Sequence, residues 1–324
     1  MERYLRGGGW MPETRARIAV IGGTNVDIGG FPNGTLVPGD SIPGRVHMSA
    51  GGVGRNIAEN AARLGMDVQL ISAIGDDANG RMLLDDCRAK GIRTDGIRIE
   101  RGGRTSVYLF VDDAGGDMHC AINDMEIQAA LTPERLAPSI DALNAMDAVV
   151  MDANLPEETI RFLTESLKVP LFADAVSAAK VGKLRGALDK LFCLKPNRIE
   201  AELLTGMQIR DASDAMEAAR RLNGTGVRRV FLTLGLEGAI CAEDGRCVFL
   251  PCAAQSVVNA SGAGDAFTAA LVWAHCEGFG LEESGAAGMA AARIAVGALE
   301  AVSPEMNRTN LMKIMDEITR RNLI

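Results

Sequence analysis

The sequence predicts an α/β fold in which helices cover both faces of a parallel sheet. Short apolar runs recur along the chain, and segments of helical length separate them. The last part of the chain turns alanine-rich and helical. The 324 residues are 47% hydrophobic, so they can bury a large core. We therefore expect a three-layer αβα domain whose ligands bind along the carboxyl edge of the strands.

The first predicted strand is the apolar run at 18–23, which ends in two glycines as buried parallel strands often do. Similar runs predict the other strands, and the segments between them and after them predict the helices. The further strands are expected at 68–74, 148–151, 170–173, 191–194 and 229–234, and the helices at 56–64, 80–90, 133–143, 157–167, 214–222, 266–277, 281–299 and 308–321.

Two segments interrupt this alternation. Residues 31–49 are rich in glycine, proline and polar residues, and residues 97–122 alternate apolar and polar side chains around a predicted hairpin turn at 112–117. Neither segment suits a buried parallel sheet, so both are treated as insertions in one domain spanning 17–324. Residues 1–16 are predicted to be a flexible extension.

Composition narrows the classes of function. The net charge is −8 and no long basic run is present, which argues against nucleic-acid and anionic-membrane surfaces. No stretch has the apolar length of a membrane-spanning helix. The seven cysteines include no C-x-x-C pair, which favours a reducing cytoplasm. The spacing of Cys241, Cys247 and Cys252 fits two adjacent strands better than a zinc site.

The strongest functional signal is a glycine turn at the start of the predicted helix at 266–277. In Gly262, Ala263, Gly264 and Asp265, small residues let backbone N–H groups approach an anion, and the helix dipole favours it. Asp265 then lies where a general base for phosphoryl transfer is needed, although it could instead cap the helix. A second glycine turn lies at 51–54, and two turns imply two ligands.

Two further polar groups follow predicted strands. Asp27, in the segment 25–27, could accept hydrogen bonds from two neighbouring sugar hydroxyls, or could simply lie in a polar loop. Asn197 and Glu200 share a helical face and could hold Mg²⁺ through water, or could form a helix cap. The P-loop pattern G-x-x-x-x-G-K-[ST] is absent, so a nucleotide must be held in another way.

Together, the segments at 49–58, 197–200 and 262–265 resemble the PfkB or ribokinase family of carbohydrate and nucleoside kinases. Within it, 43–46, 52–60 and 121–125 are most similar to the pseudouridine kinases. The resemblance implies a ribokinase-like fold with a small β lid formed by 31–49 and 97–122, ATP and Mg²⁺ as cofactors, and a homodimer through the lid. It places the sugar on Asn25, Asp27, Gly51, Gly52 and Asn56, and the nucleotide on Asp174, Asn197, Thr233 and Gly235.

The resemblance also implies the reaction, which is ATP-dependent phosphorylation of the 5′-hydroxyl of pseudouridine, with Asp265 as base and the 262–265 backbone as anion hole. Thr105 and Asn123 are the polar lid residues expected to meet the uracil edge, although 123–124 could be only a turn. Ribose, a ketose or another nucleoside remain alternative acceptors, and a non-catalytic sensor is a further alternative. Many relatives carry an aspartate where this chain has Asn259, so potassium activation stays open.

Overall fold

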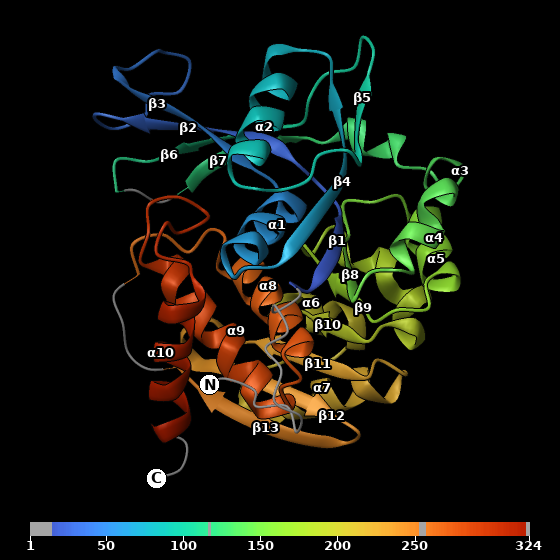
Figure 1. Cartoon of the computed structure of the whole chain (residues 1–324). Coiled ribbons are helices and arrows are strands. Elements are labelled where there is room, and N and C mark those ends of the chain that lie inside the picture. The colour runs from blue at the N-terminus through green and yellow to red at the C-terminus, as the bar shows by residue number, and fades with distance from the viewer. Residues whose placement is uncertain (1–14, 116–117, 253–256, 322–324) are drawn as a thin grey trace.

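The computed structural model describes residues 15–115, 118–252 and 257–321. Within them the strands form a nine-stranded sheet, in the order β13-β12-β11-β10-β9-β8-β1-β4-β5, and a separate four-stranded sheet (Figure 1). The predicted strands are all present. The large sheet comprises β1 (Arg17–Ile21), β4 (Asp67–Gly75), β5 (Ile97–Glu100), β8 (Ala148–Asp152), β9 (Leu171–Asp174), β10 (Cys193–Lys195), β11 (Arg229–Thr233), β12 (Gly238–Glu243) and β13 (Arg246–Pro251).

The large sheet is parallel from β5 to β11, but β12 and β13 are antiparallel. A wholly parallel sheet was therefore the wrong expectation at this edge. Only the short turn Gly235–Glu237 separates β11 from β12, and such a turn is too short for a parallel crossover. Cys241 and Cys247 lie on these two adjacent strands, as their spacing predicted.

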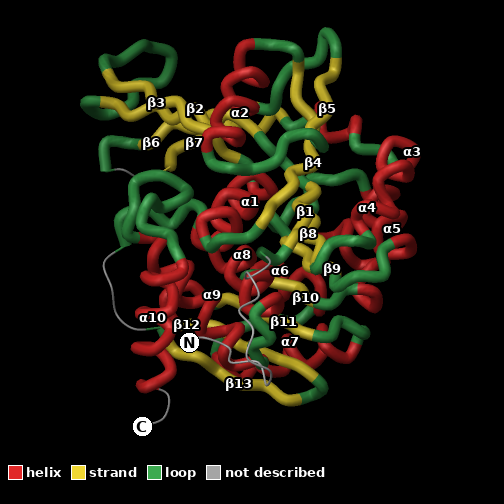
Figure 2. The backbone as a smooth tube through the Cα atoms, in the orientation of Figure 1, coloured by secondary structure: helices red, strands yellow, loops and turns green. Residues whose placement is uncertain are grey.

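Helices cover both faces of the sheet, so the three-layer architecture is confirmed (Figure 2). Side chains alternate along β1, where Ile18 and Val20 join one core and Ala19 and Ile21 join the other. The first core contains α1 (Val53–Arg63), α8 (Ala263–Cys276), α9 (Leu281–Val296) and α10 (Arg308–Arg321), and the second contains α3 (Pro133–Leu136), α4 (Ile140–Leu143), α5 (Glu157–Ser166), α6 (Arg198–Thr205) and α7 (Ala212–Gly224).

One predicted helix is broken. The segment 133–143 forms α3, a 3₁₀ turn (Ala137–Ser139) and α4, because Pro138 lacks the N–H that a continuous helix requires. The remaining α-helix is α2 (Ala78–Ala89), which packs against the small sheet through Leu83 and Val26. Two 3₁₀ helices, Glu126–Ala130 and Val181–Lys190, also lie between strands. None of the helices in the described ranges is long and apolar enough to cross a membrane.

The small sheet contains β2 (Asn25–Pro32), β3 (Gly44–Gly51), β6 (Val107–Asp112) and β7 (Met118–Asp124), in the order β3-β2-β6-β7. Its bounds differ from the predicted lid segments. Residues 97–100 form β5, which pairs with β4 in the large sheet because α2 returns the chain there as a parallel crossover. The predicted turn at 112–117 joins two antiparallel strands, although 116–117 lie outside the described residues. Most of the predicted extension, 1–14, lies outside them as well.

Candidate active site

Charged side chains gather where three neighbouring parallel strands end. The register pairs Asp152 of β8 with Asp174 of β9, and Asp174 with Lys195 of β10. All three side chains are buried. Lys195 Nζ lies 3.2 Å from Asp174 Oδ2. Burial favours the neutral amine, but the carboxylates of Asp174, Glu200 and Asp265 outweigh it and raise the pKa of Lys195. The edge therefore holds a permanent buried ammonium.

Asp265 lies beside this group, in the first turn of α8. The N-cap of α8 is Gly262, and the helix has no side-chain cap, so Asp265 is not the capping residue that the alternative interpretation required. Gly262 has a φ of 78°, and a Cβ there would lie 1.9 Å from the backbone oxygen of Ala301. Ala266 N donates a helical hydrogen bond to Gly262 O at 2.9 Å. The N–H groups of Gly264 and Asp265 precede this bond and therefore belong to the first turn, where N–H groups have no intrahelical acceptor.

The environment of Asp265 shifts its ionisation strongly. Burial, together with the negative charges of Asp174 and Asp152, raises the pKa of Asp265 to about 7. A hydrogen bond from Asn56 and the charge of Lys195 act in the opposite direction. A carboxylate with a pKa near neutrality can accept a proton at physiological pH, as a general base must.

The second glycine turn brings the residues that were predicted to bind the sugar close to Asp265. Asn25 Nδ2 donates to Asp27 Oδ1 at 2.6 Å, and a Cβ on Gly51 would lie 2.1 Å from Asp27 Oδ2. Gly52, with a φ of 100°, starts α1. Four residues on, Asn56 Nδ2 donates to Asp265 Oδ2 at 2.8 Å. The structure thus joins the two predicted turns through one buried hydrogen bond.

One face of the small sheet continues from Asp27. The register aligns Ser49, Asp27, Tyr108 and Asn123 in a row across β3, β2, β6 and β7. Asn123 is thus a strand residue and not part of a turn. Burial, reinforced by the charges of Asp27 and Asp112, raises the pKa of Tyr108.

An aromatic surface adjoins this row. The ring of Phe110 lies 5.9 Å from that of Tyr108 and 5.9 Å from that of Phe31, the second pair in an edge-to-face arrangement. Residues 27, 29 and 31 share a face of β2, and a Cβ on Gly29 would lie 2.7 Å from Phe110 Cζ. Phe31 and Phe110 were not predicted from the sequence, although the alternation along 107–111 places Phe110 on the same face as Tyr108.

Thr105 is not brought to this row. It is buried ahead of β6, where its hydroxyl donates to Asp77 Oδ1 at 2.6 Å and accepts from Gly75 N at 3.0 Å. Both contacts connect the loop to the end of β4 and the start of α2. The Thr105 hydroxyl thus stabilises this loop, and the expected contact of Thr105 with the uracil edge stays a prediction.

Three of the four predicted nucleotide residues, Asn197, Thr233 and Gly235, lie at the ends of β10 and β11, and the fourth, Asp174, ends the neighbouring strand β9. Asn197 and Glu200 form a capping box, in which Asn197 N donates to Glu200 Oε2 (2.8 Å) and Glu200 N to Asn197 Oδ1 (2.9 Å). Thr233 forms a β-bridge with Asn197, and Gly235 follows with a φ of 60° and open space around it. The helix-cap alternative is thus what the structure shows, with a buried glutamate.

These groups fit a triphosphate better than they fit a directly bound metal. A Cβ on Gly264 would lie 2.9 Å from Lys195 Nζ, so an ammonium and a helix N-terminus face the same space. The capping box already uses Asn197 Oδ1 and Glu200 Oε2. The second carboxylate oxygen of Glu200 remains outside the box, which suits contact with a hydrated Mg²⁺ only through water.

The sequence pattern of the pfkB family of carbohydrate kinases matches residues 15–308. The chain belongs to this family. It is 35% identical over 313 residues to an uncharacterized sugar kinase, YeiI, of Escherichia coli, covering 96% of this chain and 86% of that one. It is 34% identical over 301 residues to the pseudouridine kinase of the same organism, covering 92% and 96%. A ribokinase from Thermotoga maritima shares the fold at a TM-score of 0.83 and 24% identity, covering 93% and 99%.

Further buried polar residues, not predicted from the sequence, lie at the ends of β1 and β8, next to the candidate site of this PfkB-family kinase. Asp152 accepts hydrogen bonds from Gly23 N (2.8 Å) and Asn154 N (2.9 Å), and so fixes the end of β1. Asn154 Nδ2 and Thr24 Oγ1 are buried and lack a hydrogen-bond partner among the described residues. Asp152 and Asn154 could have been suspected from the sequence, because they closely follow the apolar run at 148–151 that predicts a strand.

Asn259, where the resemblance led us to expect an aspartate, shapes the loop before α8. Its Nδ2 donates to Leu299 O at 2.8 Å and its Oδ1 accepts from Ser261 N at 2.9 Å. Both the nitrogen and the oxygen of the Asn259 side-chain amide therefore form hydrogen bonds with the backbone.

Proposed function

We propose that this kinase transfers the γ-phosphoryl group of ATP to the 5′-hydroxyl of pseudouridine, giving pseudouridine 5′-phosphate and ADP. The observation that carries the proposal is the position of Asp265. Its buried carboxylate lies at the N-terminus of α8, bonded to Asn56 of the second glycine turn and close to the Lys195–Asp174 pair. One carboxylate thus lies between an anion site and a sugar site.

In this mechanism Asp265 accepts the proton of the acceptor hydroxyl as that oxygen attacks phosphorus. Phosphoryl transfer is largely dissociative, so modest basicity is sufficient. The backbone N–H groups of 262–265 and the ammonium of Lys195 stabilise the charge on the transferred group. Mg²⁺, when bound with ATP, neutralises phosphate charge, and Glu200 would hold it through water. Thr233, Gly235 and Asp174 would border the nucleotide phosphates.

The acceptor is proposed from the face of the small sheet. Asp27, with Gly51, Gly52 and Asn56, would hold the ring hydroxyls of a ribose and leave the primary alcohol toward Asp265. Phe110 and Tyr108 offer a stacking surface next to Asp27, which a free sugar would not need. Asn123, in the same row, would then meet the uracil edge and read the N1–H that distinguishes pseudouridine from uridine.

We also propose that two copies associate through the small sheet. The face opposite Asp27 carries exposed apolar side chains in register, including Met48, Leu109 and Ile122 (52%, 37% and 68% exposed). The inner part of this face, at Val26, Ala50 and Ile28, packs against α2. Burial of the outer part against a second copy would remove this apolar surface from water.

The test is an acceptor panel. The purified protein is incubated with Mg·ATP and, separately, pseudouridine, uridine, adenosine, ribose or fructose, and ADP release is measured beside an Asp265→Asn control. The proposal predicts preference for pseudouridine, with turnover lost in the control. Preference for another acceptor would retain the kinase and reject pseudouridine. Binding of ATP without turnover of any acceptor would contradict the catalytic proposal.

A further inference from the structure

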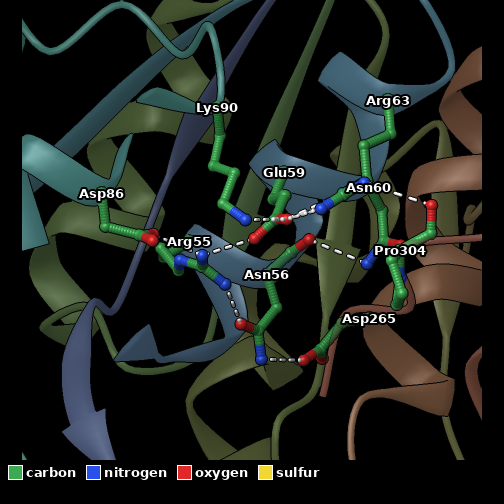
Figure 3. Close-up of polar contacts among 9 residues, drawn as sticks. All are labelled: Arg55, Asn56, Glu59, Asn60, Arg63, Asp86, Lys90, Asp265 and Pro304. Carbon is green, nitrogen blue, oxygen red and sulfur yellow. Dashed lines mark hydrogen bonds and ion pairs between the residues drawn. The ribbon is translucent and has the colours of Figure 1, made fainter. Parts of the chain in front are cut away.

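A buried cluster of charged side chains surrounds Arg55, on the opposite side of Asn56 from Asp265 (Figure 3). The Arg55 side chain is only 5% exposed. Its Nη1 donates to Asn56 Oδ1 at 3.1 Å, and its Nη2 lies 2.5 Å from Asp86 Oδ2 on α2. It also forms an ion pair with Glu59, one turn further along α1. The guanidinium therefore contacts the one side chain that donates a hydrogen bond from α1 to Asp265.

The contact with Arg55 decides which end of the Asn56 amide meets Asp265. An asparagine side chain has an NH₂ group at one end and an oxygen at the other, and the two ends are similar in size. Turned around, the amide would bring its oxygen to the Asp265 carboxylate and its NH₂ to the guanidinium, and both contacts would be repulsive. With Arg55 in place, only the oxygen suits the guanidinium, so the NH₂ group faces Asp265 Oδ2.

Arg55 is itself held by two carboxylates, Glu59 and Asp86. Glu59, which it contacts, also pairs with Arg63 (Nη2 to Oε1, 2.7 Å) and with Lys90 (Nζ to Oε1, 3.5 Å). Taking charges out of water is costly, and the cost is offset only when the groups are well paired. The pairs on Glu59 and Asp86 thus fix the guanidinium against Asn56 from two helices.

We propose that Arg55 is a positioning residue, which holds the Asn56 amide with its NH₂ group toward Asp265 and thereby keeps that carboxylate oriented toward the acceptor. The inference rests on the proposed role of Asp265 as the base. Four groups face Asp265 from different elements, namely Asn56 from α1, Asp152 from β8, Asp174 from β9 and Lys195 from β10. Without Arg55 the amide can turn, and the hydrogen bond that favours the ionised carboxylate is weakened. Proton uptake by Asp265 should then become easier.

The test follows the titration of Asp265 directly. The protein is labelled with ¹³C at the aspartate carboxyl carbons, and the Asp265 signal is assigned by its absence in Asp265→Asn. Arg55→Gln should raise the titration midpoint by about one pH unit, because a carboxylate loses an oriented donor. The acid limb of the kcat/KM profile should move in the same direction. Arg55→Lys retains the charge but not the planar fork, and should also raise the midpoint.

Lys90→Gln is the matched control, because it removes a cation that contacts Glu59 and not Asn56, and it should leave the midpoint unchanged. Asn56→Ala should raise the midpoint, and adding Arg55→Gln to it should have no further effect. If Arg55→Gln fails to fold, Asp86→Asn removes an outer anchor that is 27% exposed and should raise the midpoint less.

An unchanged midpoint in the folded Arg55 variants, or additive effects of the Arg55 and Asn56 substitutions, would overturn the inference. Failure of the proposed function would look different. The wild-type protein would then turn over no acceptor, whereas the carboxyl titration needs no substrate.

Discussion

Asp265 shows how a single carboxylate obtains its properties from tertiary neighbours. The glycine turn that precedes it is a local feature, and the sequence predicted both the turn and the helix that follows. Its raised pKa depends on burial and on Asp174 and Asp152, which are distant in sequence. The hydrogen bond from Asn56 spans 209 residues, so no local pattern could have predicted it. The hydrogen bond of Thr105 to Asp77 could not be predicted for the same reason, since Asp77 lies in another element.

The raised pKa of Asp265 predicts a pH-dependent effect on stability. The folded pKa is about 7 and the ordinary value is 3.8, so between these pH values the folded protein retains a proton that the unfolded chain has released. The contribution of Asp265 to stability therefore falls as the pH rises through this window. Asp265→Asn removes the ionisation and should be more stable than the wild type at pH 8, by up to about 4 kcal/mol for a shift of this size.

This prediction is checked by urea unfolding of both proteins between pH 5 and pH 8. The difference in the free energy of unfolding should shrink as the pH falls. A difference that is the same at every pH would mean that ionisation of Asp265 is not its cause.

The elements that carry the site are positioned by glycines with positive φ. Gly262 starts α8 and Gly52 starts α1, and in each case a Cβ would collide with backbone of a distant segment. The sequence predicted these turns because glycine clusters ahead of helices are locally distinctive. It could not predict the close contacts with Ala301 and Gly23, which depend on how the elements pack.

Gly262→Ala and Gly206→Ala form a matched pair. Both glycines are in the left-handed region, with φ values of 78° and 69°, but nothing lies within 4 Å of a Cβ on Gly206. Gly206→Ala should cost roughly 1 kcal/mol of strain, whereas Gly262→Ala adds a collision with Ala301 O and should cost roughly 2 to 5 kcal/mol. Urea unfolding measures both. Equal losses of stability would mean that the Ala301 contact does not position α8.

At the scale of the whole molecule, the sequence predicted the three layers and most strands, because buried parallel strands form continuous apolar runs. It predicted the edge of the large sheet less well, since the hairpin of β12 and β13 follows β11 without a crossover. The small sheet was predicted from alternation, but β5 was misassigned to it. A short alternating segment does not reveal which sheet it joins.

The exposed apolar face of the small sheet leads to a prediction about the proposed dimer. Ile122→Glu places a charge in the proposed contact and should convert a dimer into a monomer in sedimentation velocity. Ile199→Glu, on α6 at 58% exposure, is the control and should leave the assembly unchanged. A wild-type monomer, or a dimer that survives Ile122→Glu, would contradict a contact through this face.

In the proposed reaction, Asp265 takes the proton from the acceptor hydroxyl while the phosphoryl group is transferred. The most direct measurement is the single-turnover rate of phosphoryl transfer from ATP to pseudouridine as a function of pH, in the wild type and in Asp265→Asn. We expect the wild-type rate to rise with pH to a plateau, with a midpoint near the Asp265 pKa of about 7, and the variant rate to be lower by roughly a thousandfold or more. A variant rate within tenfold of the wild type, with the same pH profile, would contradict this role of Asp265.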